Sequence, residues 1–354
     1  MTNRSPLVDL VAGPPAQPLD VEAMDAAKRR WATRAKPPGS LGRLEDLAAQ
    51  VAGITGRCPA VVPNTAKLVV FAGDHGVVAE NVTAWPQQVT AFMVETMAAG
   101  QAAVSVLAAA SGVEVTVVDV GVASDVTHLG GVVHRKVRPG TANIANEPAM
   151  TRTEASSAVE VGGSVAKQMI SAGADMLVGG EMGIGNTTPA TALIATITGA
   201  SPSTLCGPGA GLDSSQLGHK SAVIGASIDR VLHQSTIPLD GVELLAQLAG
   251  LEIAALTGFY LEAAKAKVPC IIDGVIALSA LCVADLIAPG TAQRMIAGHR
   301  SSEPAASAAL DHFGLSPVLD LDLRLGEGTG ACLAVPIVNA AIGALADMAD
   351  LPEV

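Results

Sequence analysis

Short, largely apolar runs recur along the chain after residue 66. Each run ends close to glycine, and the runs are Leu68–Phe71, Val113–Val120, Met176–Val178 and Cys270–Ile272. Strands that lack polar alternation are buried on both faces, which is typical of a parallel sheet covered by helices. Ala-rich stretches separate the runs and predict covering helices at 101–110, 156–172, 214–231 and 242–264. The pattern therefore predicts an α/β fold with an open, doubly wound, mostly parallel sheet.

Helical patterns also occur outside the region in which apolar runs and Ala-rich stretches follow one another. Asp20 is a suitable N-cap for a helix whose apolar positions, including Trp31, fall at helical spacing, and Ser40 is a suitable N-cap for a second helix. A long helical sequence follows Leu239. These segments predict a second, smaller helical domain that is assembled from pieces outside the sheet.

Composition and charge narrow the functional classes. The chain has 21 Lys and Arg against 33 Asp and Glu, which gives a net charge of −12, and only 2% of its residues are aromatic. A chain of this charge repels phosphate backbones and has few rings for base stacking, so we expect no nucleic-acid partner. The high apolar content, 49%, with 15% charged residues predicts large buried interfaces, including one between subunits.

Membrane insertion, export and metal binding are not supported by the sequence. Mean hydropathy is +0.44, but prolines, among them Pro336, interrupt the uncharged stretches 182–212 and 328–346. The first twenty residues contain no continuous apolar segment. Five cysteines without CxxC spacing indicate neither a disulfide framework nor a zinc site. We therefore expect a cytoplasmic protein with reduced thiols, no membrane partner and no metal.

Glycine-rich loops after the predicted strands are the first candidates for ligand binding. Ligands of open parallel sheets bind outside the carboxyl ends of the strands. Gly179–Thr188 leads into a helix and can present backbone N–H groups at its positive end, which suits a phosphate, and Gly207–Gly211 offers the same chemistry. Lys220, in the helix after the second loop, is a candidate counter-charge for a phosphate; a solvated helix lysine is the alternative.

Two glutamates lie beside glycines in such loops. Glu327 precedes an apolar helix, and Glu181 lies in the earlier loop. A glutamate backed by apolar neighbours has a raised pKa, as a general base requires, whereas an exposed loop glutamate is the alternative. His75 is either an acid–base group or a structural histidine. The cluster His299–Glu303 is, taken alone, typical of a surface turn. Together these residues predict an enzyme that acts on a phosphorylated small molecule through a carboxylate base.

Eight ordered motifs span residues 36–331, nearly the whole chain. They are Lys36–Gly42, Phe71–Val77, Pro86-Gln87 with Val89-Thr90, Gly180–Thr188, Gly207–Gly209, Asp273-Gly274, His299–Ser301 with Glu303-Pro304, and Leu325–Ala331. Read together, they resemble the nicotinate-nucleotide:dimethylbenzimidazole phosphoribosyltransferase family, which makes the lower-ligand nucleotide of cobalamin. The resemblance implies a homodimer in which residues 61–310 form the large α/β domain, and residues 1–60 and 311–354 form the small helical domain.

The resemblance also implies a reaction and a set of site residues. The 5-phosphoribosyl group passes from nicotinate mononucleotide to 5,6-dimethylbenzimidazole or a related base, giving α-ribazole 5′-phosphate and nicotinate with no cofactor. The family's general base falls on Glu327, its second glutamate on Glu181 and its phosphate-binding lysine on Lys220. Further phosphate contacts fall on Gly183, Gly209, Gly211, Gly274 and Ser301. The base pocket falls on Leu325, Met182, Thr83 and Gln87 or Gln88.

The chain departs from the family pattern in two places. Asn81-Val82-Thr83 stands where Gly-Val-Ser is commoner, and Ala305-Ala306 stands where Gly-His often follows Glu-Pro. Two other hypotheses remain beside the transferase. A dinucleotide-dependent oxidoreductase is weakened because no GxGxxG follows the first strand. In a non-catalytic nucleotide-sensing module, Glu327 would be dispensable.

Overall fold

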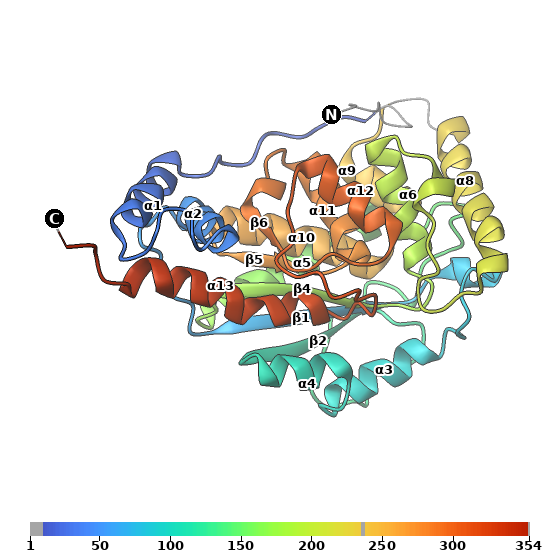
Figure 1. Ribbon diagram of the computed structural model, residues 1–354. Helices are drawn as coiled ribbons and strands as arrows, with labels where there is room; N and C mark the ends of the chain where they lie inside the picture. Colours follow the sequence, from blue (N-terminus) through green and yellow to red (C-terminus); the bar gives the residue numbers. More distant parts are fainter. Residues whose placement is uncertain (1–9, 235–237, 353–354) are drawn as a thin grey trace.

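A six-stranded sheet forms the centre of the computed structural model, which describes residues 10–234 and 238–352 (Figure 1). Its strand order is β3-β2-β1-β4-β5-β6, and every neighbouring pair is parallel. The strands are β1 (Ala66–Gly73), β2 (Val113–Gly121), β3 (Val132–His134), β4 (Met176–Met182), β5 (Cys270–Ile272) and β6 (Met295–Ala297). The prediction of an open, doubly wound parallel sheet is confirmed.

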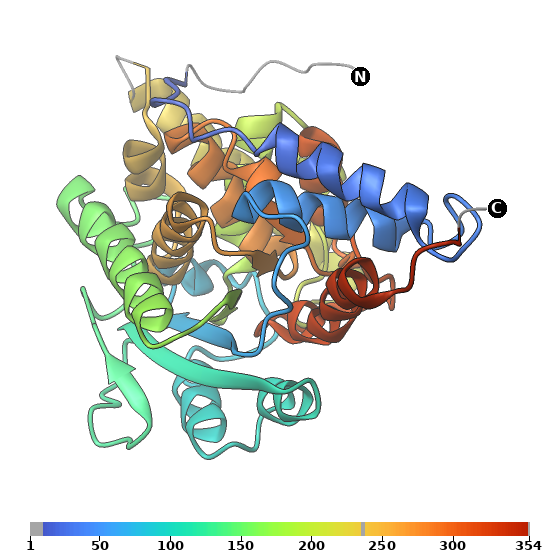
Figure 2. The same cartoon turned by 90° about the vertical axis from the view of Figure 1, so that its left-hand side faces the viewer.

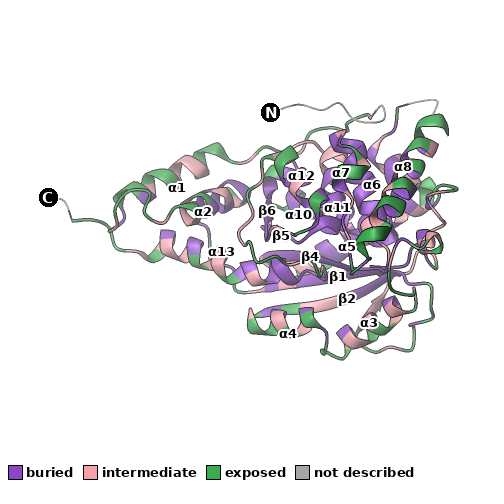
Figure 3. Ribbon diagram, turned by 45° about the vertical axis from the view of Figure 1, so that its right-hand side comes forward, coloured by how far each residue is buried: buried purple, intermediate pink, exposed green. Residues whose placement is uncertain are grey.

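Helices cover both faces of this sheet. Along β1, Val69 and Phe71 belong to one buried cluster, while Leu68 and Val70 belong to the cluster on the other face. Figure 3 shows the resulting buried centre and the exposed outer sides of the helices. One face is covered by α5 (Arg152–Ser171), α6 (Thr187–Thr198), α7 (Pro202–Leu205), α8 (Leu217–Gln234), α9 (Gly241–Leu248), α10 (Leu251–Ala266), α11 (Val275–Ile287) and α12 (Pro304–Phe313). The other is covered by α1 (Val21–Thr33), α2 (Arg43–Thr55), α3 (Val89–Ala98), α4 (Ala103–Ala110) and α13 (Thr329–Asp347).

The two ends of the chain meet in space. Helices α1 and α2 lie against α13 (Figure 2), and Trp31 of α1 shares a buried cluster with Leu68 of the sheet. The N-terminal helical segment is therefore continuous with the core on that face. The predicted boundaries at residues 60 and 310 stay predictions, and residues 1–9 of the first segment lie outside the described residues.

Of the two N-caps predicted for these helices, the structure confirms one. Asp20 caps α1, because its side chain accepts a hydrogen bond of 2.9 Å from the N–H of Ala23. The prediction that Ser40 caps the second helix is wrong. Helix α2 begins at Arg43 after Gly42, which has a φ of 51°. Glycine is the residue that adopts this left-handed backbone at little cost.

Three further details differ from the prediction. The single helix expected at 242–264 is two helices, because the chain breaks at Gly250, where a Cβ would collide with the side chains of His75 and Glu252. Strands β3 and β6 are only three residues long, too short to give a clear apolar run. Helix α13 continues through Pro336. The backbone hydrogen bond that proline removes is offset by burial of this helix against α2 and α4.

Two described segments have the length and apolarity of a membrane-crossing helix, 89–110 and Thr329–Asp347. The first consists of α3 and α4, which are separate helices. In the second, α13, the most apolar stretch is 56% buried inside the protein. Core helices of ordinary proteins share these properties, so the two segments are weak evidence for a membrane span.

The sheet order reverses direction between β1 and β4. From β1 the chain first adds β2 and β3 on one side, and later β4, β5 and β6 on the other. In open α/β sheets such a switch point opens a crevice at the carboxyl ends of the strands. The loops that follow β1, β4, β5 and β6 converge there and carry the residues of the candidate site.

Candidate active site

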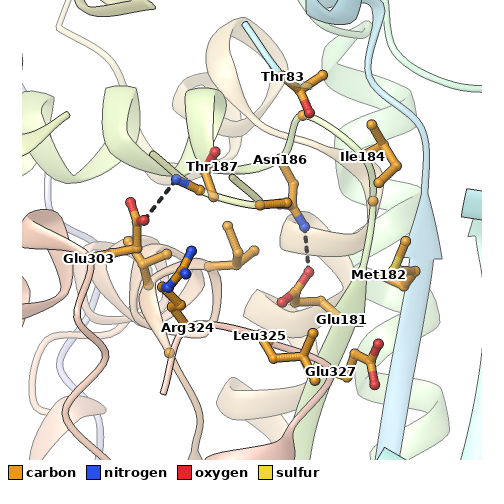
Figure 4. Close-up of a pocket in the computed structure, with 18 of the residues that line it drawn as sticks. Thr83, Glu181, Met182, Ile184, Asn186, Thr187, Glu303, Arg324, Leu325 and Glu327 are labelled. Atoms are coloured by element: carbon orange, nitrogen blue, oxygen red, sulfur yellow. Dashed lines mark hydrogen bonds between the residues drawn. The ribbon is translucent and has the colours of Figure 1, made fainter. Parts of the chain in front are cut away.

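A pocket of about 740 Å³ lies at this switch point, a size suited to small-molecule ligands. In Figure 4, Glu181 and Glu327 lie on one side of the pocket and Glu303 lies on the other. Apolar side chains form much of the remaining wall. The side chains and backbone that line it come from 82–93, Glu181–Thr187, Pro208–Ala210, Gly274–Ile276, His299–Glu303 and Asp322–Glu327.

Glu327 lies in a strained, tightly held turn before α13. Its φ is 64°, between Gly326 and Gly328, whose φ values are 85° and 89°. A glutamate in this conformation is uncommon and is held by its surroundings. Gly180 of β4 provides the space, because a Cβ there would collide with the carbonyl of Glu327. The turn thus aims a single carboxylate at a fixed place in the pocket wall.

The Glu327 carboxylate is a basic group in a dry environment. The side chain is 4% exposed, and its Oε2 accepts a hydrogen bond of 3.3 Å from the N–H of Val104 in the first turn of α4. Burial raises the pKa of Glu327, the Val104 hydrogen bond partly opposes this, and the charge of Asp273 adds to the increase. The expectation of a raised pKa is therefore confirmed, and the exposed-loop alternative is wrong.

Glu181 lies next to Glu327 at the end of β4. It is 5% exposed, and the Asn186 side-chain amide donates a hydrogen bond to its Oε2. Burial raises the pKa of Glu181 well above its usual value, and the charges of Glu252, Asp273 and Glu327 act in the same direction. Like charges this close favour retention of a proton on Glu181.

Asp273, which follows β5, stabilises the turn that contains Glu327. Its carboxylate accepts hydrogen bonds from the N–H groups of Gly328, at 3.2 Å, and Ala331, at 2.9 Å. His299 Nε2 lies 3.2 Å from its Oδ1, and both side chains are buried. Burial alone would lower the pKa of His299, but the hydrogen bond and charge of Asp273 outweigh this and raise it. Gly330 leaves room for the His299 ring, since a Cβ there would collide with it.

Lys220 is buried beside the two glycine-rich loops. Its side chain is 1% exposed, and Nζ donates hydrogen bonds to Thr187 Oγ1, at 2.8 Å, and to the carbonyl of Gly207, at 2.9 Å. Burial lowers the pKa of Lys220, which the charges of Glu303 and Cys206 partly counteract. The alternative of a solvated helix lysine is wrong. An ammonium directed at two loop glycines and a helix N-terminus favours an anionic ligand.

His75 belongs to a buried ion pair behind the pocket. Its Nε2 lies 2.9 Å from Glu252 Oε1, and both side chains are at most 1% exposed. Burial lowers the pKa of His75, but the charge and hydrogen bond of Glu252 outweigh this and raise it. A Cβ on Gly183 would lie 2.9 Å from the same Nε2. His75 therefore supports the floor of the glycine loop and does not reach the pocket, which favours a structural role.

The structure brings most of the predicted site residues to one pocket. Those in its wall are Glu327, Glu181, Met182, Gly183, Gly209, Gly274, Ser301, Thr83 and Leu325. Lys220 lies directly behind the wall, in contact with Thr187. Gly211, Gln87 and Gln88 are not in the wall, and their assignments stay predictions. At Asn81, where the family commonly has glycine, φ is 55°, a conformation that asparagine tolerates better than most residues.

The local sequence pattern missed several residues of the wall, among which only the family resemblance had pointed to Ser301. His299, Ser301 and Glu303 are buried, so the interpretation of this cluster as a surface turn is wrong; β6, which precedes it, is too short to be recognised from its apolar pattern. Trp85 and Phe92 line the opening and are 52% and 63% exposed. Two of the seven aromatic residues of the chain therefore contribute to the pocket.

No group of three or more His, Cys, Asp or Glu side chains in the described ranges is arranged to hold a metal ion. Two of the buried carboxylates are instead neutralised in pairs, Glu252 by His75 and Asp273 by His299. The pocket therefore combines a buried carboxylate base, an anion site on the opposite side, and apolar walls between them.

Comparisons with known proteins agree with this chemistry. A family model described as phosphoribosyltransferase matches residues 16–354. The nicotinate-nucleotide–dimethylbenzimidazole phosphoribosyltransferase of Chloroflexus aggregans is 47% identical over 336 residues, covering 95% of this chain and 94% of the relative. The enzyme of the same name from Chromobacterium violaceum is 44% identical over 338 residues, which cover 96% of this chain and 97% of the relative.

A solved structure shows the same fold. The crystal structure of the nicotinate-nucleotide–dimethylbenzimidazole phosphoribosyltransferase from Thermus thermophilus superposes with a TM-score of 0.88 and 40% identity. The match covers 94% of this chain and 97% of that protein. Since the family model and the relatives extend over almost the whole length, the chain belongs to the nicotinate-nucleotide–dimethylbenzimidazole phosphoribosyltransferase family and is an enzyme of the phosphoribosyltransferase class.

Proposed function

We propose that the chain transfers the 5-phosphoribosyl group of nicotinate mononucleotide to 5,6-dimethylbenzimidazole or a related base for cobalamin assembly. The observation that carries this proposal is the buried Glu327, whose carboxylate faces an apolar pocket while Lys220 lies at its other end. A benzimidazole needs a base for its ring N–H and apolar walls for its rings. A nucleotide needs an anion site for its phosphate.

The phosphate of the nucleotide lies against Lys220 and the loops of Gly183 and Gly274. Thr187 and Ser301 border the same region, and their hydroxyls can donate to phosphate oxygens. Helix α6 begins at Thr187 and directs its positive end at this position. These contacts hold the phosphate end of the nucleotide. The anomeric carbon, where the bond breaks, then lies near Glu327.

The reaction is a displacement at the anomeric carbon of the ribose. One benzimidazole nitrogen attacks this carbon, while Glu327 takes the proton from the other nitrogen. The bond between the anomeric carbon and the pyridinium nitrogen breaks, and its electron pair returns to that nitrogen. The products are α-ribazole 5′-phosphate and nicotinate, with inversion from β to α. Because the leaving pyridinium is positively charged, its departure needs no external acid.

The apolar wall holds the flat acceptor. Met182, Leu325 and Thr83 border the pocket near Glu327, and Phe92 extends the wall towards the opening. Glu181, held by Asn186, borders the same region, and its raised pKa favours the uncharged form, which does not compete with Glu327 for a proton. An environment that excludes water raises the basicity of Glu327 and protects the ribosyl group from hydrolysis.

The direct test is a product assay. The protein is incubated with nicotinate mononucleotide and 5,6-dimethylbenzimidazole, and the products are separated by chromatography and identified by mass spectrometry. We expect α-ribazole 5′-phosphate and nicotinate in equal amounts, and a loss of turnover of about 10²- to 10⁴-fold in Glu327→Gln. No product at high enzyme concentration would refute the proposal, and a fully active variant would remove Glu327 from the role of base.

We also propose that the enzyme is a cytoplasmic homodimer. Phe92 and Leu325 expose apolar surface around the opening of the pocket, and contact with a second subunit would remove this surface from water. All five cysteines are free thiols, which fits a reducing compartment. Light scattering after size-exclusion chromatography measures the mass directly, and a monomer at micromolar concentration would contradict the dimer.

A further inference from the structure

Arg324 presents an unpaired guanidinium in the wall of the pocket. It lies in the loop before α13, between Leu323 and Leu325, which line the pocket as well. Among the described residues of the wall it is the only lysine or arginine. The residue is exposed, and within residues 10–234 and 238–352 its guanidinium has no hydrogen bond and no ion pair within 4.0 Å.

Acidic residues lie near Arg324 but leave its charge unpaired. Asp322 and Glu303 line the same pocket, and Figure 4 shows Arg324 between Glu303 and Leu325. Asp320, four residues earlier, pairs instead with Arg300, whose Nε lies 3.5 Å from its Oδ2. The guanidinium of Arg324 is therefore available to an anionic group of a ligand in the pocket.

Two cations serve the pocket at different depths. Lys220 is 1% exposed and lies behind the glycine-rich loops, whereas Arg324 is exposed and lies on the loop that carries Glu327. Nicotinate mononucleotide has two anionic groups, the 5′-phosphate and the carboxylate of the pyridine ring, with the ribose between them. Because Lys220 and the start of α6 take the phosphate in the proposed function, the ring carboxylate remains for Arg324.

The chemistry of the leaving group also favours a cation beside the ring. The planar guanidinium matches a carboxylate with two parallel hydrogen bonds. When the bond to the anomeric carbon breaks, its electron pair returns to the pyridinium nitrogen, and the ring changes from a zwitterion of net charge zero to the nicotinate anion. A nearby positive charge interacts more favourably with the ring after this change than before it, so it lowers the barrier to departure.

We propose that Arg324 binds the carboxylate of the nicotinate ring, and so selects nicotinate over nicotinamide nucleotides and stabilises the leaving group. This inference rests on the proposed function, because it takes nicotinate mononucleotide as the donor. It adds a specificity-determining residue three positions before the proposed base, on the same loop. The donor is then held by a cation at each of its two anionic ends.

The test compares donors with and without the carboxylate. Nicotinamide mononucleotide has an uncharged amide of similar size in its place. We expect the native protein to use the nicotinate nucleotide with a kcat/KM about 10- to 100-fold higher, as for one charge-assisted contact. In Arg324→Gln this ratio should fall towards one, because kcat/KM falls for the nicotinate nucleotide and is unchanged for the nicotinamide nucleotide. The nicotinamide nucleotide thus controls for the folding of the variant.

Product inhibition gives an independent measure of the same contact. The inhibition constant of free nicotinate should rise about 10- to 100-fold in Arg324→Gln, while that of nicotinamide should stay the same. Arg135→Gln is the matched control, since Arg135 is exposed, lies outside the pocket and donates to the carbonyl of His134. Its donor ratio and inhibition constants should equal those of the native protein.

The other outcomes separate the inference from the proposed function. Equal losses with both nucleotides in Arg324→Gln would show that Arg324 acts on the phosphate or on the loop of Glu327, and would overturn the inference. A native protein that does not discriminate between the donors, or a variant that keeps the native ratio, would overturn it as well. No turnover of nicotinate mononucleotide by the native protein would instead refute the proposed function, and the inference would fall with it.

Discussion

The carboxylate of Asp273 accepts a hydrogen bond of 3.2 Å from the N–H of Gly328, the residue that directly follows Glu327. Its other oxygen accepts from the N–H of Ala331, at 2.9 Å. Asp273 therefore connects the end of β5 to the first turn of α13. The proposed base is held in its left-handed conformation by this connection and by its close approach to Gly180.

Asp273→Asn should lower turnover more than it lowers nucleotide binding. An asparagine can accept only one of the two backbone hydrogen bonds and lacks the charge that raises the pKa of His299, so the turn of Glu327 shifts. We expect kcat to fall about 10- to 100-fold, the KM for nicotinate mononucleotide to change less than about threefold, and the free energy of unfolding to fall by about 1–3 kcal/mol.

Asp119→Asn is the matched control. Asp119 lies near the carboxyl end of β2, is fully buried, and accepts a backbone hydrogen bond of 2.9 Å from Val122, but it lies outside the pocket. The Asp119→Asn substitution should lower the free energy of unfolding without the loss of kcat. If both variants lose activity in proportion to stability, Asp273 has no specific role in holding Glu327.

The pH dependence of turnover should report the raised pKa of Glu327. The base acts only when ionised, so kcat should fall as pH drops through its pKa, which burial raises above the usual value of 4.5. The acidic limb should therefore appear at a higher pH than an exposed glutamate would give. In Glu327→Gln the residual rate should lose this limb. An unchanged limb in the variant would assign it to another group.

Glu181→Gln should change the pH dependence of stability. Because burial raises the pKa of Glu181 well above 4.5, its contribution to stability is fully present below the pKa of the unfolded chain and is lost as pH rises through the folded pKa. Glutamine stays neutral and keeps an acceptor for Asn186. We expect the variant to gain stability over the native protein as pH rises from about 4 to about 8, measured by urea unfolding. A constant difference across this range would mean that Glu181 is not protonated in the fold.

Lys220→Met should weaken nucleotide binding. The substitution keeps the length of the buried stem but removes the charge that Thr187 and the Gly207 carbonyl orient towards the glycine loops. We expect KM for nicotinate mononucleotide to rise about 10- to 100-fold, as for a lost charge-assisted contact, with a smaller change in kcat. Lys167→Met, at a lysine that is 61% exposed, is the control. An unchanged KM would place the phosphate elsewhere.

The parts of this molecule that were predictable from the sequence are those with local signals. Apolar runs identified β1, β2, β4 and β5, and glycines around Glu181 and Glu327 identified the two carboxylates. The hydrogen bond from Gly209 to Glu303 joins residues that are 94 positions apart in the sequence. The hydrogen bond from Gly328 to Asp273 joins residues that are 55 positions apart. Such contacts depend on the order of strands in the sheet, which no local pattern specifies.

Tryptophan fluorescence should report ligand binding from one residue. The chain has two tryptophans: Trp31 is buried in α1, whereas Trp85 lines the opening of the pocket and donates from Nε1 to the carbonyl of Ala210 at 2.9 Å. In Trp31→Phe, the addition of nicotinate mononucleotide and a base should shift the emission to shorter wavelength, because the ligands exclude water from Trp85. In Trp85→Phe the emission should not change. A ligand-dependent signal from Trp31 alone would mean that binding acts on the helices at the ends of the chain rather than on this opening.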